Sequence, residues 1–277
     1  MLTERCHWRH LGVALLSCGF ALALGACSDD EDGGDGVGFG PPQTEGLPSH
    51  EALRTALQDV VAEGAAGNGG FGLNMWATVV DRSGIVVAVA FSGPGVGDQW
   101  LLSRVISAQK ASTANGLSLN GLALSTANLW AATQPGGSLF GLQESNPVDH
   151  DVAYAGDVGT FGTTGDPMTG KRVGGVNVFG GGFALYNSAG ERIGGIGVSG
   201  DSSCADHNIA WKARDQLGLD FVPAGVADGG TTDNIIYDIG GDGVSVSGFG
   251  HPECSILATQ IGQQLPITHP LSAPPAT

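Results

Sequence analysis

A run of glycines and branched apolar residues, followed by a loop and an amphipathic stretch, constrains the fold of this chain most. It covers residues 194–214 and reads GGIGVSGDSSCADHNIAWKAR. Ile196 and Val198, set among glycines, suit a strand that other segments approach closely on both faces. After Gly200, the aspartate and serines at 201–203 offer N-caps to a helix whose apolar residues fall on one stripe. The segment therefore predicts a strand, a tight loop and a helix.

Upstream, hydrophobic periodicity predicts two helices separated by a β-hairpin. Apolar residues at helical spacing indicate a helix over 50–64, with Ser49 as its N-cap, and a longer helix over 98–119. Between these helices, apolar runs at 73–81 and 85–91 flank a short polar turn, which is typical of a hairpin.

Between the second helix and the glycine-rich strand, the pattern is less regular. Residues 122–130 indicate a further helix or a helical turn, and 135–175, rich in Gly, Asp, Thr and Pro, a long loop or lid. Short strands are expected at 176–178 and 183–186, the latter joined to the glycine-rich strand by a turn at 187–190. The order helix, two strands, helix, strands, helix predicts an α+β fold, an antiparallel sheet flanked by helices.

Charge and glycine content narrow the class of protein. The 277 residues include 48 glycines and carry a formal net charge of −16. So much glycine favours turns and close backbone contacts over a helical bundle. A surface this acidic repels phosphate backbones and anionic lipid headgroups, so we expect no nucleic acid partner.

The N-terminus has the features of a bacterial lipoprotein signal peptide over residues 1–26. Arginines precede an apolar run at 11–24, and a small-residue box ends at Cys27. We expect lipidation at Cys27, followed by an acidic, Gly-rich tether over 27–47. The alternatives are an uncleaved anchor or an ordinary secretory signal. Each alternative exports the domain, and the lipid-anchored form places it in the bacterial cell envelope, facing the periplasm or the cell surface.

Export changes the interpretation of the remaining cysteines. After the signal peptide and Cys27, only Cys204 and Cys254 are left. In an oxidising compartment two such cysteines predict a disulfide, the alternative being two buried free thiols. The disulfide would attach the C-terminal extension at 240–277 to the start of the predicted helix.

Two motifs together resemble the GlcG/HbpS family. The first is the strand GGIGVSG at 194–200 followed by the DHNIA of 206–210, and the second is ATVVDRSGIVVAV at 77–89 with QKASTA at 109–114. The resemblance spans about 50–222 with a long interruption. It implies a profilin-like sandwich, haem as cofactor and a homo-oligomer.

On this resemblance, the family domain would cover 48–239, with 135–175 as an inserted loop. Family members are described as haem-binding or haem-degrading, or as domains of unknown role. CxxC, HExxH and GxSxG patterns are absent from the sequence, so no catalytic residue is predicted. Haem-dependent oxidative haem degradation follows from the resemblance alone.

Histidines are the side chains best suited to bind haem iron or another transition metal. His207 lies at the start of the predicted helix, and the disulfide would bring His251 near it. His150 lies between two aspartates that can orient it or bind a hard cation, and His50 precedes the first helix. All four are candidate cofactor ligands, and His207 and His150 are candidate metal ligands. The alternative for each is a solvated or hydrogen-bonding residue.

Two further candidates are carried over from the family pattern. Lys110 matches the family's helix lysine and would pair with a carboxylate or a haem propionate, or else extend to solvent. Asp206 matches the family's acidic helix residue and would be a pocket acid or a cap.

These observations lead to one function and two alternatives. The first is an exported, lipid-anchored haem-binding protein acting in capture, sensing or buffering. The second is a lipoprotein on the same fold that binds another small ligand or is structural. The third, with the least support, is an enzyme acting on small organic substrates.

Overall fold

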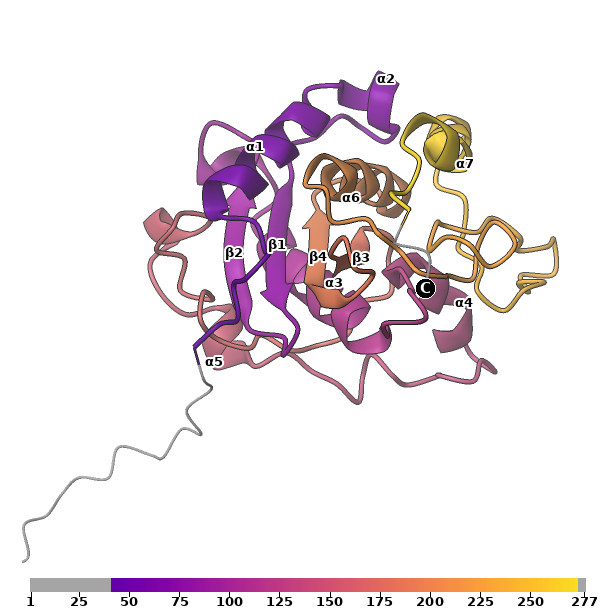
Figure 1. Ribbon diagram of the computed structural model, residues 1–277, viewed down its shortest axis with the longest axis horizontal. Coiled ribbons are helices and arrows are strands. Elements are labelled where there is room, and N and C mark those ends of the chain that lie inside the picture. The colour runs from indigo at the N-terminus through magenta and orange to yellow at the C-terminus, as the bar shows by residue number, and fades with distance from the viewer. Residues whose placement is uncertain (1–40, 274–277) are drawn as a thin grey trace, which may run out of the picture. The chain divides into compact units, whose positions relative to one another are not determined.

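A four-stranded antiparallel sheet forms the centre of the domain (Figure 1). Its strands are β1 (Trp76–Asp81), β2 (Val86–Phe91), β3 (Gly182–Tyr186) and β4 (Arg192–Ser199). Their order across the sheet is β2-β1-β4-β3, so two hairpins lie beside each other and β1 pairs with β4 at the centre. The predicted α+β class with an antiparallel sheet is confirmed.

The computed structural model describes residues 41–273. These residues belong to one compact unit. The predicted signal peptide at 1–26, the lipidation site Cys27 and the tether as far as residue 40 lie outside the described residues, and those predictions stay open. Within 41–273, none of the helices has the length and apolar character needed to cross a bilayer.

Five helices of five or more residues surround the sheet within 41–273, together with several shorter ones. The longer ones are α1 (His50–Val61), α2 (Gly64–Asn68), α3 (Ser103–Leu117), α6 (Ser203–Gln216) and α7 (Ile256–Thr268). The shorter ones are η1 (Val96–Asp98), η2 (Thr126–Leu129), α4 (Trp130–Thr133), α5 (His150–Ala153) and η3 (Val158–Thr160). As predicted, the Ser49 side chain caps α1 by accepting a hydrogen bond from Ala52 N–H.

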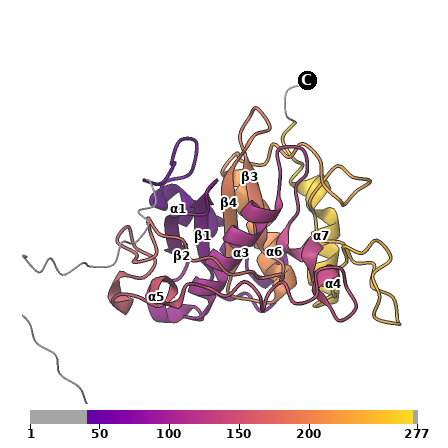
Figure 2. The ribbon, with the colours of Figure 1, turned by 90° about the horizontal axis from the view of Figure 1, so that it is seen from below.

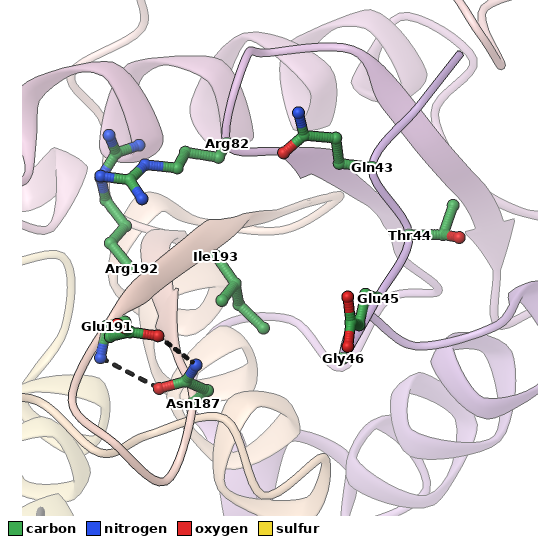
Figure 3. Close-up of a pocket in the computed structure, with 9 residues that line it drawn as sticks. All are labelled: Gln43, Thr44, Glu45, Gly46, Arg82, Asn187, Glu191, Arg192 and Ile193. Atoms are coloured by element: carbon green, nitrogen blue, oxygen red, sulfur yellow. Dashed lines mark hydrogen bonds between the residues drawn. The ribbon is translucent and has the colours of Figure 1, made fainter.

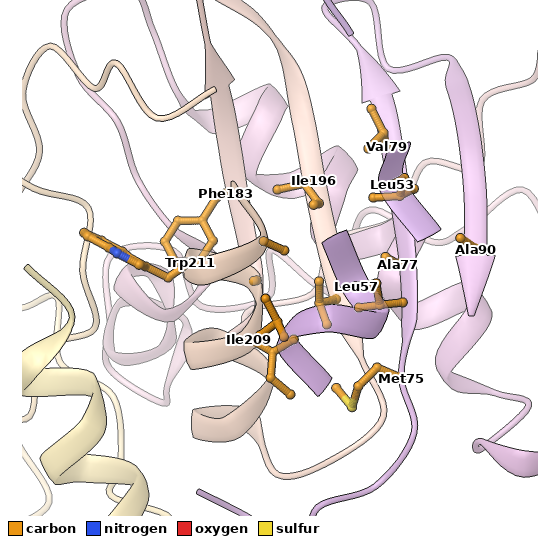
Figure 4. Close-up of a cluster of buried hydrophobic side chains, with 14 of the residues drawn as sticks. Leu53, Leu57, Met75, Ala77, Val79, Ala90, Phe183, Ile196, Ile209 and Trp211 are labelled. Atoms are coloured by element: carbon orange, nitrogen blue, oxygen red, sulfur yellow. The ribbon is translucent and has the colours of Figure 1, made fainter. Parts of the chain in front are cut away.

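The helices cover the two faces of the sheet unequally. Helices α1 and α6 pack on one face, where Leu57, Ile209 and Trp211 meet the side chains of all four strands (Figure 4). Helix α3 packs on the other face, against β4, β1 and β3 (Figure 2). There Trp76 and Val105 are buried. The domain thus has a core on each side of the sheet.

The glycines of β4 explain how α3 comes so close. A Cβ atom placed at Gly197 would lie 2.0 Å from the carbonyl oxygen of Ser107, and one at Gly195 would lie 2.6 Å from that of Ala111. Both distances are far shorter than a van der Waals contact. The helix backbone therefore rests directly on the strand backbone, which only glycine allows.

The segment 135–175, predicted as a loop or lid, packs against the core beside β2. Phe161, Met168 and Val173 are buried in the cluster under α3. Val86 N–H donates to the carbonyl of Lys171, and its own carbonyl accepts from Gly170 N–H. The segment protects the free edge of β2 in the way that natural sheets cover exposed edges.

Two expectations about secondary structure were wrong. Residues 176–178 form no strand, because Asn177 N–H donates to the Thr113 side chain of α3. Helix α3 begins at Ser103, since η1 and a turn occupy 96–102. Helix α7, which was not predicted from the sequence, lies in the segment after 221 and beside α6 (Figure 1).

Candidate functional site

The first turn of α6 brings together four of the six predicted ligand-binding residues. The ammonium of Lys110, on α3, lies 2.6 Å from Asp206 Oδ2 and donates to the Val198 carbonyl at 3.1 Å. Asp206 Oδ1 accepts from Asp201 N–H. Burial lowers the pKa of Lys110 and raises the pKa of Asp206 to about 6, because a low-dielectric environment disfavours both charges. Lys110 thus pairs with a carboxylate of its own chain.

His207 lies one residue further along α6 and is fully buried. Its Nε2 is 3.1 Å from both Ile235 N and Asn234 Oδ1, so that nitrogen is engaged in either tautomer. The ring contacts Phe183 at 4.6 Å between centroids, and Nδ1 is buried without a hydrogen bond. Burial lowers the pKa of His207 to about 3, so the imidazole is neutral at pH 7. A ligand from solvent has no path to either nitrogen.

His251 is the fourth member of the cluster. Its Nδ1 donates to the Pro252 carbonyl at 2.7 Å, so its Nε2 accepts from the Ser203 hydroxyl at 2.8 Å. Burial lowers the pKa of His251 to about 4. Both ring nitrogens are therefore bonded within the fold.

The contacts of α6 hold the segment after residue 221 against the helix and the sheet. Cys204 and Cys254 form the predicted disulfide, with a Cα–Cα distance of 5.9 Å. Further along the helix, Arg214 makes a bidentate ion pair with Asp233 at 2.7 and 2.8 Å. These contacts, with those of His207 and His251, join α6 to the segment after residue 221. The geometry of the helix is that of a structural junction.

The other two predicted histidines are more exposed. The Nε2 of His50 is 2.8 Å from the Gly162 carbonyl, to which it donates. The His150 side chain, on α5, is 81% exposed and lies 3.3 Å from Asp151. His207 is interior and His150 is at the surface, so the structure does not bring the two candidate metal ligands together. Across residues 41–273, no group of three or more His, Cys, Asp or Glu side chains is placed to hold a metal ion.

A groove between α6 and α7 contains His269, which was not among the predicted ligands. It has a volume of about 370 Å³ and is lined by Leu257, Ile261, His269 and the stem of Lys212. The Nδ1 of His269 is 3.0 Å from the Thr268 hydroxyl, and the described residues give its Nε2 no hydrogen bond. The groove thus combines an available imidazole nitrogen with an apolar wall. The sequence did not indicate this groove because α7, which forms one of its walls, was not predicted.

A larger pocket of about 760 Å³ lies where the two hairpin turns meet the segment before α1 (Figure 3). Arg82 from the β1–β2 turn and Arg192 at the start of β4 line one side. Glu45, Glu191 and Ile193 line the rest. Part of the predicted tether forms a wall of this pocket, because residues 43–46 follow the domain surface.

The sequence from 49 to 215 matches the family model described as haem degrading protein HbpS-like. That match covers more than half of the chain. The chain belongs to the HbpS-like family. The resemblance inferred from the sequence motifs is therefore confirmed. The HbpS-like match ends in the last turn of α6, so His251, Cys254, α7 and His269 all lie in the part of the chain beyond it.

Solved structures similar to this HbpS-like chain include a PduOC:heme complex, the ORFY protein and HbpS, and no curated protein matches it. A PduOC:heme complex shares 26% identity, with 61% of this chain and 94% of that chain covered and a TM-score of 0.40. The ORFY protein of Klebsiella pneumoniae shares 22% identity, with 61% and 90% covered and a TM-score of 0.39. HbpS shares 18% identity, with 60% and 86% covered and a TM-score of 0.34.

Proposed function

We propose that this HbpS-like protein binds haem. The observation that carries the proposal is the family match over 49–215, since the family is described by its action on haem. Capture, sensing and buffering of haem all require reversible binding as their first step. Haem binding is therefore the property to be tested first.

The residues that fit a haem are those of the groove between α6 and α7. An axial ligand must present a neutral imidazole nitrogen to the iron, and the Nε2 of His269 has no hydrogen bond within the described residues. Leu257 and Ile261 offer apolar contact to a porphyrin face, as in most cofactor sites. The α6 cluster does not fit, because the nitrogens of His207 and His251 are buried.

At this groove, the residues of the chain would hold the haem and orient it. The Trp211 indole N–H donates to the His269 carbonyl at 2.9 Å and fixes the backbone of the proposed ligand against α6. Lys212 donates to Glu63 and to the carbonyl of Gly67, which anchors the floor of the groove to α2. Bound haem would supply the iron-centred redox chemistry, which belongs to the cofactor.

A haemin titration of the purified protein, followed by the Soret absorbance, tests the proposal. We expect saturable binding that His269→Ala weakens at least about tenfold, since a lost axial ligand removes the bond that orients the iron. His150→Ala is the matched control, because it removes an exposed imidazole elsewhere. His50→Ala, His207→Ala and His251→Ala complete the set, since their roles as ligands stay predictions.

The outcomes separate the function from the site. Absence of a saturable Soret shift in the natural protein would reject haem binding. Binding that survives His269→Ala but is lost in His150→Ala or His50→Ala would keep the function and move the ligand to α5 or α1. Thermal unfolding of each variant without haemin checks that the fold is intact.

We further propose that the protein is exported and anchored in the cell envelope by a lipid on Cys27. The apolar run and the small-residue box before Cys27 support this, and a disulfide between Cys204 and Cys254 suits an oxidising compartment. Metabolic labelling with a fatty-acid analogue should mark the natural protein and leave Cys27→Ser unlabelled. Equal labelling of both would contradict the anchor, as would a soluble natural protein.

A further inference from the structure

The pocket between the hairpin turns has two arginines on one side and no protein carboxylate bound to either. Within 41–273, Arg104, Lys110 and Arg214 are buried, and each forms a salt bridge. Arg82 and Arg192 form none, and the described residues give the Arg82 guanidinium no hydrogen bond. Figure 3 shows the two guanidinium groups close to each other on the wall of the pocket.

Arg192 is held in place with part of its bonding capacity unused. Its Nη1 donates to the carbonyl of Asn115 at 2.7 Å and also contacts the Asn115 side chain, so it is fixed at the C-terminal end of α3. Its Nε is buried and has no hydrogen bond. Burial lowers the pKa of Arg192, and the neighbouring charge of Arg82 lowers it further. The described residues give the Nη2 of Arg192 no hydrogen bond, so this nitrogen and the neighbouring Arg82 guanidinium can donate charge-assisted hydrogen bonds to a carboxylate.

Of the two glutamates in the lining, Glu45 lies across the pocket from the arginines and Glu191 lies beside Arg192 (Figure 3). The described residues give the Glu45 carboxylate no hydrogen bond or ion pair, while Glu191 accepts from the Asn187 amide at 3.1 Å. Ile193 is the apolar member of the lining. The pocket therefore presents positive charge, negative charge and an apolar contact at separate places.

This charge pattern excludes simple ions as good ligands. A monovalent anion would meet the guanidiniums but also face Glu45 and the field of a chain with net charge −16. A simple amine would meet the opposite problem at Arg82 and Arg192. A zwitterion satisfies both sides and carries no net charge.

We propose that this pocket binds a small zwitterion of the α-amino acid type. The carboxylate lies against Arg82 and Arg192, the ammonium faces Glu45, and an apolar side chain contacts Ile193. This ligand is independent of haem, because the pocket and the α6–α7 groove share no lining residue.

Calorimetric titration of the whole protein with the twenty common amino acids tests the proposal. We expect saturable binding of at least one apolar amino acid, with L-leucine as the reference probe. Two analogues of leucine, 4-methylpentanoate without the ammonium and 3-methylbutylamine without the carboxylate, should each bind at least about tenfold more weakly, because each loses a charge-assisted interaction.

Single substitutions test which side chains bind the carboxylate and the ammonium of the ligand. Arg82→Gln should weaken amino acid binding about tenfold or more, whereas Lys171→Gln, which removes an exposed positive charge elsewhere, should leave it unchanged. Glu45→Gln should weaken the binding of L-leucine and leave the binding of 4-methylpentanoate unchanged. Arg82 has no side-chain bond within the described residues, so unfolding curves of Arg82→Gln should match those of the natural protein.

Three results would overturn the proposal. They are the absence of saturable binding for all twenty amino acids, unchanged binding in Arg82→Gln, and 4-methylpentanoate binding as tightly as L-leucine. The last result would make the pocket a site for simple carboxylates.

Discussion

Lys110 on α3 and Asp206 on α6 form an ion pair of 2.6 Å at the end of the central strand β4, and both side chains are buried. The pair joins helices from opposite faces of the sheet. A buried pair contributes little when intact, but removal of one partner leaves an uncompensated charge in a low-dielectric environment.

We therefore expect Lys110→Met to lower the free energy of unfolding by about 3–5 kcal/mol. Lys110→Met combined with Asp206→Asn should recover much of this loss, because the amide carries no charge and keeps an acceptor for Asp201 N–H. Urea unfolding at pH 7 measures both. Equal stability of the single variant and the natural protein would show that water reaches the pair.

The buried His251 should make the protein less stable in mild acid. Its pKa is lowered from the ordinary 6.5 to about 4, chiefly by burial. The stability that this group contributes is present above the unfolded pKa of 6.5 and is lost as pH falls toward 4. Between pH 7 and pH 5 the loss is about 2 kcal/mol.

His251→Gln should reduce the difference in unfolding free energy between pH 7 and pH 5 by about that amount. Asp206 acts in the opposite direction, since its pKa is raised to about 6, but it is present in both proteins and cancels in the comparison. Between pH 7 and pH 8 the two proteins should show the same dependence. If the unfolding free energies of the natural protein and His251→Gln fell in parallel from pH 7 to pH 5, the folded protein would accept the proton on His251.

Two glycines on opposite sides of the α3–β4 contact should respond in opposite ways to alanine. Gly197→Ala places a methyl group 2.0 Å from the Ser107 carbonyl and should cost about 3 kcal/mol or more. Gly116→Ala, on α3, meets no atom within 4 Å and should stabilise the protein by about 1 kcal/mol. Thermal unfolding measures both. If Gly197→Ala left the stability unchanged, α3 would have to be able to move away from the sheet.

The disulfide should contribute strongly to stability because it closes a long loop. Cys204 and Cys254 are separated by 50 residues, for which the chain-entropy model gives about 4 kcal/mol. Replacing both by Ala should lower the free energy of unfolding by that order. Under reducing conditions the natural protein should show the same loss while the double variant stays unchanged. A stable reduced protein would show that other contacts of the segment after residue 221, such as the ion pair of Arg214 with Asp233, are enough to hold it.

The sequence alone was sufficient to predict those elements whose structure depends on the local pattern of residues. Glycines within an apolar run predicted β4, Ser49 predicted the start of α1, and the count of remaining cysteines predicted the disulfide. Helix α7 was missed because its buried face consists of Ala258, Thr259, Gly262 and Leu265, which gives no apolar stripe, and because Pro266 lies inside it.

The candidate site depended on contacts between distant segments. The partner of Lys110 is a carboxylate 96 residues away, and no local signal states whether a buried lysine meets a side chain or a ligand. His207 and His251 were chosen because imidazole binds metals, yet both nitrogens of His251 and the Nε2 of His207 bond to the backbone and side chains around α6, and the Nδ1 of His207 is buried. The arginine pocket was missed because Arg82 and Arg192 lie in different hairpins.

The pairing of β1 with β4 also determines when the domain can fold. Trp76 lies opposite Ser199, so the two middle strands come from the beginning and the end of the family domain. A chain emerging from the ribosome has only one hairpin until Ser199 has been synthesised, and long-range pairing of this kind is slow. For most of its synthesis the nascent protein therefore lacks its central sheet, and the first hairpin must wait for a partner that is made more than a hundred residues later.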